Sequence, residues 1–180
     1  LYEALQTLAG QNVVYAEIRF SPARPVLDRG IDFGELLEQL TRARACGEAD
    51  FGIESGLILS LSRNRGADVC KRLAVEAVEL SDGALAGFDI SDDESNWPAH
   101  LFRSALEVID RAGYPATIHA GETVGPESIA DAINLPGARR VGHGLSAYRD
   151  PELMKRLLRE GIHLELCPTS NVSTNQIATV

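Results

Sequence analysis

Apolar, strand-like runs alternate with amphipathic helical patterns along the chain, and this rhythm is what most limits its fold. The runs lie at residues 13–20, 52–59, 84–90, 115–119, 139–143 and 162–167. Helical patterns fall at residues 1–9, 33–46, 66–80, 98–112, 126–134 and 150–160. Strands that alternate with helices form βα units, which build parallel sheets. The sequence therefore predicts a single α/β domain with a parallel sheet.

The charge balance and the cysteines limit the compartment and the partners. The 180 residues carry a formal net charge of −9 without a lysine- or arginine-rich block, which argues against binding to nucleic acid or to an anionic membrane. No apolar stretch approaches the ~20 residues that span a bilayer. The three cysteines are widely spaced and form no C-x-x-C pair, which favours a reducing compartment. We expect a cytoplasmic protein with a small-molecule partner and make no prediction of its oligomeric state.

The first predicted strand has one apolar face and one mixed face. Val14, Ala16, Ile18 and Phe20 share the first face, and Val13, Tyr15, Glu17 and Arg19 share the second. In a barrel the apolar set packs under the helices, so Glu17 and Arg19 face the interior, where they need each other or another partner. A structural ion pair is the simpler interpretation, and contact with a substrate is the alternative.

Three polar tracts each follow directly on a strand-like run. They are His119-Ala120-Gly121-Glu122, Gly142-His143-Gly144 and Cys167-Pro168-Thr169-Ser170-Asn171. The carboxyl ends of parallel strands meet at one edge or mouth, where α/β folds place their chemistry. The tracts therefore predict one shared pocket.

His119 and Glu122 are suited to metal-assisted hydrolysis. A strand-end imidazole can ligate a metal through a neutral nitrogen, and a carboxylate beside the site can move a proton between water and a substrate heteroatom. Gly121 permits a sharp bend, so that both side chains can point into one cavity. An H-x-x-E tract taken alone is equally compatible with a structural role.

The other histidines and Cys167 are weighed by their positions. His143 lies between two glycines that leave space beside its ring, at the end of the strand that follows His119, which favours a functional role. His163 alternates with apolar residues inside a strand and is interpreted as structural. His100 lies in a helical pattern and is expected to be exposed. Cys167 is interpreted as a packing residue rather than a nucleophile.

An acidic run, residues 89–94, also falls at a strand end. Its carboxylates could contact a polar edge of a substrate or cap the next helix. Because that helix begins near Pro98, capping is the simpler interpretation for Asp93 and Glu94.

Taken together, four tracts closely resemble the adenosine deaminase family in order and spacing. They are Tyr15-Ala16-Glu17-Ile18-Arg19-Phe20-Ser21-Pro22, His119-Ala120-Gly121-Glu122-Thr123, Arg140-Val141-Gly142-His143-Gly144 and Glu165-Leu166-Cys167-Pro168-Thr169-Ser170-Asn171. The resemblance implies a (β/α)8 TIM barrel of the metal-dependent hydrolase type, of which this chain holds about six βα units, strands two to seven. It also implies that a zinc-activated water displaces ammonia from C6 of adenosine or deoxyadenosine, as part of purine salvage.

The resemblance also assigns roles to individual residues. His119 would be a ligand of Zn²⁺, and Glu122 would protonate purine N1 and later assist the departure of ammonia. His143 would orient and polarise the zinc-bound hydroxide. Gly121 and Asp92 would bind substrate, with Asp92 at the position of a family glycine whose backbone contacts the purine. Because the tract around Asp92 is more similar to that of AMP deaminases, AMP, adenine or another adenosine-like compound is the alternative substrate.

Besides Asp92, the sequence differs from the family in its zinc ligands. The family's H-x-H pair on the first strand and its aspartate on the last strand have no counterpart in this sequence. We therefore expect residues 1–180 to be a central portion of the catalytic barrel domain, whose complete site would hold one zinc ion. Its edges at residues 13–20 and 162–167 would leave backbone groups unpaired and make the isolated chain poorly stable. The alternative hypothesis is a catalytically inactive, truncated barrel that serves in binding or assembly.

Overall fold

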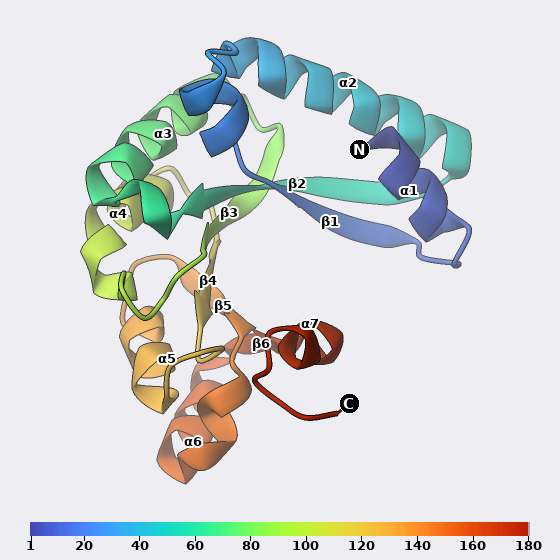
Figure 1. Cartoon of the computed structure of the whole chain (residues 1–180). Coiled ribbons are helices and arrows are strands. Elements are labelled where there is room, and N and C mark those ends of the chain that lie inside the picture. The colour runs from blue at the N-terminus through green and yellow to red at the C-terminus, as the bar shows by residue number, and fades with distance from the viewer. Residues whose placement is uncertain (180) are drawn as a thin grey trace.

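A computed structural model of the protein describes residues 1–179 and contains six strands with helices between them (Figure 1). The strands are β1 (Tyr15–Phe20), β2 (Glu54–Ser62), β3 (Leu85–Ser91), β4 (Ala116–Ala120), β5 (Ala138–His143) and β6 (His163–Glu165). The α-helices are α1 (Tyr2–Ala9), α2 (Phe33–Phe51), α3 (Ala67–Leu80), α4 (Arg103–Arg111), α5 (Pro126–Ile133), α6 (Pro151–Glu160) and α7 (Pro168–Ser173). Short turns of other helix types are η1 (Ala23–Asp28), η2 (Arg63–Arg65), η3 (Ala99–Phe102) and η4 (Leu145–Arg149).

All six strands form one parallel sheet in the order β1-β2-β3-β4-β5-β6. Figure 1 shows that the sheet curves, with α2 to α6 arranged around its convex side and α7 beside β6 on the other side. Neighbouring strands that follow one another in sequence are the topology of a βα barrel. The predicted parallel α/β fold is therefore confirmed, as a six-stranded half-barrel whose edges are β1 and β6.

The apolar core lies between the convex side of the sheet and the helices. On β2, Leu57, Leu59 and Leu61 are fully buried and belong to this core, whereas the intervening Ser60 points to the concave interior. Helices α3 and α4 contribute further fully buried side chains, among them Ala74 and Leu106. Each fully buried leucine side chain stabilises the fold by about 1.5–3 kcal/mol, so this layer is the main reason that the strand ends are held in fixed positions.

Several element boundaries differ from the prediction. Helix α2 continues to Phe51, where Gly52 adopts a left-handed conformation with φ 67° and ends it, and β2 continues to Ser62. The pattern at residues 98–112 divides into η3 and α4, and β6 ends at Glu165, before Cys167. Helix α7 was not predicted, because its sequence has no apolar periodicity.

The two faces of β1 differ from the prediction in one respect. Val14 is 77% exposed, although it was expected to pack under the helices; it precedes β1, which is an edge strand. Glu17 and Arg19 face the interior as predicted, and each pairs with residues on other strands rather than with each other. Glu17 pairs with Arg140 on β5, and Arg19 pairs with Glu165 on β6.

These contacts form a charged network across the concave side of the sheet. Arg140 contacts Glu165 at 3.4 Å, so one arginine contacts carboxylates from both edge strands. Arg19 Nε lies 3.3 Å from Asp89 Oδ2 on β3. Burial alone would lower the pKa of Arg140, but the hydrogen bond and charge of Glu17 outweigh it and raise that pKa. The simpler interpretation of Glu17 and Arg19, ion pairing inside the barrel, matches these contacts.

Candidate active site

The turns that follow β3, β4 and β5 have left-handed backbone conformations. The φ angles are 74° at Asp92, 68° at Gly121, 63° at His143 and 64° at Gly144. Such angles are uncommon for residues other than glycine, and they concentrate where tertiary structure holds a functional side chain in place. At Gly121 a Cβ would lie 2.5 Å from Cδ1 of Ile129, so this turn leaves no space for a side chain. The backbone therefore turns sharply at each strand end that carries a predicted site residue.

His119 is oriented by a buried carboxylate. Its Nδ1 donates a hydrogen bond of 2.9 Å to Oδ1 of Asp89, which is fully buried and also accepts from Ser60 at 3.2 Å. Burial by itself would lower the pKa of His119, but the hydrogen bond and charge of Asp89 outweigh it and raise that pKa. With Nδ1 engaged in this way, Nε2 is the nitrogen available to a ligand, as in histidines that bind metals.

Gly142 provides the space for the His119 ring. A Cβ at Gly142 would lie 2.7 Å from Nδ1 and 2.8 Å from Cγ of His119. The sequence interpretation assigned the flanking glycines to space beside His143. The structure shows that Gly142 accommodates the neighbouring strand's histidine, while Gly144 makes the left-handed turn after β5.

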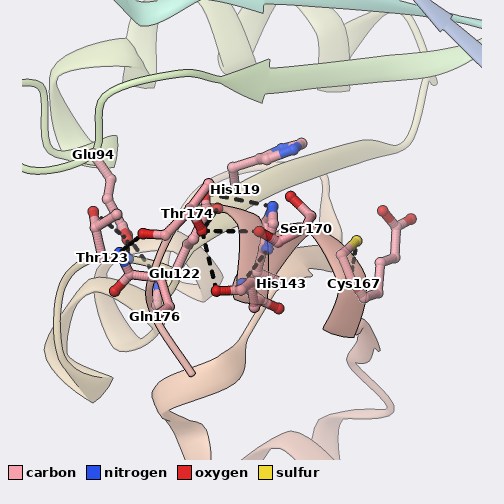
Figure 2. A network of polar contacts seen from close by, with 12 residues as sticks. Glu94, His119, Glu122, Thr123, His143, Cys167, Ser170, Thr174 and Gln176 are labelled. Carbon is pink, nitrogen blue, oxygen red and sulfur yellow. Dashed lines mark hydrogen bonds and ion pairs between the residues drawn. The ribbon is translucent and has the colours of Figure 1, made fainter. Parts of the chain in front are cut away.

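His143 joins the two other predicted residues (Figure 2). Its Nε2 lies 3.4 Å from Oε2 of Glu122, and its ring centroid lies 5.4 Å from that of His119. Its Nδ1 contacts the side-chain amide of Asn171 at 3.0 Å, and Asn171 is 1% exposed. His119, Glu122 and His143 therefore lie close together at the carboxyl ends of β4 and β5, whereas the shared pocket that the three tracts indicate stays a prediction. Asn171, from the third tract, supports His143 from α7.

Asp92 lies at the end of the neighbouring strand β3. Its side chain accepts a hydrogen bond from Ser62 at the end of β2, and the residue is exposed. Gly121 contributes its backbone N–H to a hydrogen bond with Glu94. The structure thus places both predicted substrate-binding positions at the same end of the sheet as His119, without a direct hydrogen bond to it among residues 1–179.

Glu94 was expected to cap the helix near Pro98, and the structure contradicts this. Its carboxylate accepts hydrogen bonds from the backbone N–H groups of Gly121, Thr123 and Val124 and from the hydroxyls of Thr123 and Ser128. Burial would raise the pKa of Glu94, but these hydrogen bonds outweigh it and hold that pKa below its usual range. The sequence interpretation considered only near neighbours, and this contact joins two different strand ends.

Arg63 was also missed by sequence reasoning. The residue follows β2 and is fully buried. It donates to the backbone oxygen of Trp97 at 2.8 Å and to that of His119. Burial lowers the pKa of Arg63, against the charges of Glu94 and Asp89, which raise it. A single arginine in a loop gives no sequence pattern from which such a role could be deduced.

The residues present do not make a complete metal site. Within residues 1–179 there is no group of three or more His, Cys, Asp and Glu side chains placed to hold a metal ion. A catalytic zinc site uses three protein ligands and an open position. His119 therefore supplies one ligand position at most, and this chain by itself does not fit the ion.

The other histidines and Cys167 lie outside this cluster. His163 is exposed at the start of β6, and Cys167 Sγ contacts the backbone oxygen of Glu165 at 3.2 Å. The side chain of His100 is 57% exposed, and its Nδ1 lies 3.0 Å from Asp131.

None of the helices in residues 1–179 has the length and apolarity that crossing a bilayer requires.

Comparison with known sequences identifies similar proteins. A family profile described as adenosine deaminase matches residues 1–180. An adenosine deaminase from Pectobacterium atrosepticum is 34% identical over 179 residues, and one from Erwinia tasmaniensis is 38% identical over 178 residues. Each match covers 99% of this chain and 53% of the relative. The chain thus spans about half the length of the curated relatives it matches.

Solved structures share the same fold. An adenine deaminase from Arthrobacter aurescens superposes with a TM-score of 0.92 at 25% identity, covering 99% of this chain and 54% of that one. An amidohydrolase from Burkholderia ambifaria, solved with bound Zn, superposes with a TM-score of 0.90 at 29% identity. The match covers 94% of this chain and 47% of that one. An N6-methyl-AMP deaminase from Arabidopsis thaliana superposes with a TM-score of 0.81 at 25% identity, and the match covers 99% of this chain and 54% of that one. These matches confirm the predicted barrel of the metal-dependent hydrolase type.

Proposed function

This chain belongs to the adenosine deaminase family, and we propose that the protein containing it hydrolyses adenosine or deoxyadenosine to the corresponding inosine and ammonia, in purine salvage. The observation that carries the proposal is the contact of Glu122 with His143 at 3.4 Å, with the ring of His119 5.4 Å from that of His143 between centroids. A proton-transfer carboxylate, a second imidazole and one candidate metal ligand are part of the set of groups that metal-assisted deamination uses.

Glu122 is the proposed proton carrier. As the carboxylic acid it donates a proton to ring N1, which draws electrons from C6 and makes that carbon electrophilic. Water adds its oxygen to C6 and gives one proton to the Glu122 carboxylate just formed, which leaves a tetrahedral carbon that bears a hydroxyl and the amino group. Glu122 passes this proton to the leaving nitrogen, the C–N bond breaks, and Glu122 takes up the hydroxyl proton as the C6 carbonyl forms. One water is therefore consumed for each ammonia produced.

His143 is the proposed group that orients the attacking water. Its Nε2 faces Glu122 Oε2, and its ring is near His119, so it lies between the proton carrier and the candidate metal ligand. Its opposite nitrogen is bound by Asn171 at 3.0 Å, which fixes the ring plane. Because Asn171 binds Nδ1, the ring presents Nε2 in one fixed direction. In other hydrolases, removal of a single preorganised donor lowers kcat by about 10²–10³-fold.

We also propose that the complete site contains one Zn²⁺, with His119 as one ligand. The ion would lower the pKa of a bound water toward neutrality. Because this chain offers no full ligand set within residues 1–179, the other ligands would come from strands outside this sequence. Residues 1–180 would then be part of a catalytic barrel domain, and the 180-residue chain alone would bind no zinc and show no turnover.

Another aminopurine is the second candidate substrate. Asp92 lies where the family resemblance places a glycine, and structural neighbours include an adenine deaminase and an N6-methyl-AMP deaminase. We favour adenosine because the other tracts resemble the adenosine deaminase family and because relatives at 34% and 38% identity are named adenosine deaminases. Initial rates with adenosine, adenine and AMP under identical conditions would rank the three.

The test uses the full-length protein that contains this chain. Zinc content by metal analysis, loss of adenosine absorbance and chromatographic identification of inosine measure the proposed activity directly. Glu122→Gln removes the proton carrier and is expected to lower kcat by about 10²–10⁴-fold. Glu127→Gln, an exposed carboxylate in the first turn of α5, is the matched control and should retain activity. Equal activity of Glu122→Gln and wild type would contradict the proposal.

A further inference from the structure

We propose that Glu94 is a positioning residue that holds the turn at residues 121–124, and with it the side chain of Glu122, in the orientation that faces His143. This inference rests on the proposed function of Glu122. Glu94 does not contact Glu122 directly. It binds the backbone on both sides of that residue, at Gly121 and Thr123. Figure 2 shows Glu94 beside Thr123 and Glu122.

Each carboxylate oxygen of Glu94 accepts hydrogen bonds from a different part of the turn. Oε2 accepts from the N–H of Gly121 at 2.7 Å and from the hydroxyl of Ser128. Oε1 accepts from the N–H of Val124 at 2.9 Å, from the N–H of Thr123, and from the Thr123 hydroxyl at 3.1 Å. Five donors converge on one carboxylate, three of them backbone groups of the turn. Successive N–H groups arranged in this way form a concave anion site, here filled by the protein's own side chain.

The five donors make this contact selective for the ionised carboxylate, against the opposing effect of burial. Glu94 is only 6% exposed, and a buried carboxylate is stable only when hydrogen bonds replace its water. Its lowered pKa is consistent with that compensation. If the carboxylate were removed, the three N–H groups would need other partners, and the hydrogen bond from the N–H of Ser146 to the oxygen of Gly121, at 2.9 Å, would hold only the start of the turn. The direction of Glu122 therefore depends on Glu94.

Asp93, like Glu94, does not cap the helix near Pro98 as expected, because the N-cap of η3 is Pro98 and no side chain bonds there; Asp93 instead makes a local contact. Asp93 accepts from the N–H groups of Ser95 at 2.9 Å and Asn96 at 3.1 Å, and from the Asn96 side chain. Asp93 and Glu94 are thus neighbouring carboxylates with different roles, one that closes its own turn and one that fixes the turn after β4. This difference provides a matched control.

Glu94→Gln changes the charge and the donor pattern with little change in shape. The amide has one acceptor oxygen, and its NH2 group must face N–H donors on one side. If NH2 occupies the place of Oε2, the hydroxyl of Ser128 can rotate to accept, but the N–H of Gly121 is left unpaired. If it occupies the place of Oε1, the N–H groups of Thr123 and Val124 are unpaired. Either arrangement loosens the turn.

The experiment measures exchange and kinetics on the full-length protein. Hydrogen–deuterium exchange is followed for peptides spanning residues 119–125, and kcat and KM are determined, in wild type, Glu94→Gln and Asp93→Asn. Loss of a buried, charge-assisted hydrogen bond shifts a conformational equilibrium by about 10–100-fold. In Glu94→Gln we therefore expect the amide exchange of the turn to become faster by that factor and kcat to fall by the same factor. KM should change by less than about threefold, because Glu94 does not contact the substrate site directly. Asp93→Asn should leave kcat and the exchange of residues 119–125 unchanged.

Two results would overturn the inference. One is wild-type exchange across residues 119–125 in Glu94→Gln, and the other is a kcat that falls no further than in Asp93→Asn. If Glu94→Gln does not fold, Glu94→Asp decides: it keeps the charge on a side chain one methylene shorter, which cannot reach both Gly121 and Thr123, and unchanged exchange at residues 119–125 would likewise contradict the inference. Absence of deaminase activity in the wild type would contradict the proposed function alone, because the exchange data still report whether Glu94 holds the turn.

Discussion

The side-chain amide Nδ2 of Asn171 donates a hydrogen bond of 3.0 Å to Nδ1 of His143, and both side chains are buried. Because an amide N–H can only donate, Nδ1 must accept, and the proton of the neutral ring lies on Nε2. Nε2 is the nitrogen that faces Glu122 at 3.4 Å. Asn171 therefore determines which tautomer His143 presents to the candidate site.

Replacing Asn171 by alanine should disturb the tautomer and lower activity. The unpaired, buried Nδ1 is expected to reduce the free energy of unfolding by about 1–3 kcal/mol. Nitrogen NMR shifts of His143 should move from a single Nε2–H form to a mixture, and kcat should fall by about tenfold or more. The matched control is Thr169→Ala, an exposed position in the same helix. Unchanged His143 shifts in Asn171→Ala would contradict the tautomer assignment.

Gly142→Ala should displace the ring of His119. The new Cβ would lie 2.7 Å from His119 Nδ1, closer than real contacts allow, so the ring must shift and weaken its hydrogen bond to Asp89. We expect a loss of about 1–3 kcal/mol in the free energy of unfolding, measured by urea denaturation, and reduced zinc content in the full-length protein. At Gly10 a Cβ meets its nearest atom at 3.4 Å, so Gly10→Ala is the control. Normal zinc content and stability in Gly142→Ala would show that the ring does not depend on this space.

Arg140→Ala should destabilise the curved sheet. It leaves Glu17 and Glu165 without their shared partner, and the three side chains are only 26%, 23% and 23% exposed. Breaking a fully buried pair costs about 3–5 kcal/mol, and partial exposure reduces the expectation to about 1–3 kcal/mol. Arg111→Ala removes an exposed pair with Glu107 and should change stability by less than about 0.5 kcal/mol. Denaturation curves of equal midpoint for both variants would rule out a stabilising role for the network.

The thiol of Cys70 should resist alkylation. Burial raises the pKa of Cys70 to about 11, whereas Cys46 is exposed. At pH 8 a thiol of pKa about 11 is thiolate to about one part in a thousand, against about a quarter for an ordinary thiol. Mass spectrometry after iodoacetamide treatment should therefore show modified Cys46 and unmodified Cys70, with both modified in urea. Comparable labelling of the two in the native protein would contradict the burial of Cys70.

Much of the fold could be predicted because the relevant forces are local. Apolar runs and helix patterns identified the six strands and the parallel sheet, and strand-end placement brought His119, Glu122 and His143 together. The contacts of Glu94 and Arg63 could not be predicted, since each joins strand ends that lie far apart in sequence. Similarly, periodicity placed Glu17 in the interior but could not identify its partner, which depends on the curvature of the sheet.

The contacts of Arg19 connect the shape of the sheet to its chemistry. This one guanidinium touches Glu165 on the last strand and Asp89, the carboxylate that orients His119. The first and last strands are therefore tied together by the same side chain that supports the candidate metal ligand. Loss of the Arg19 side chain would therefore weaken the connection between the edge strands and the support of His119 together.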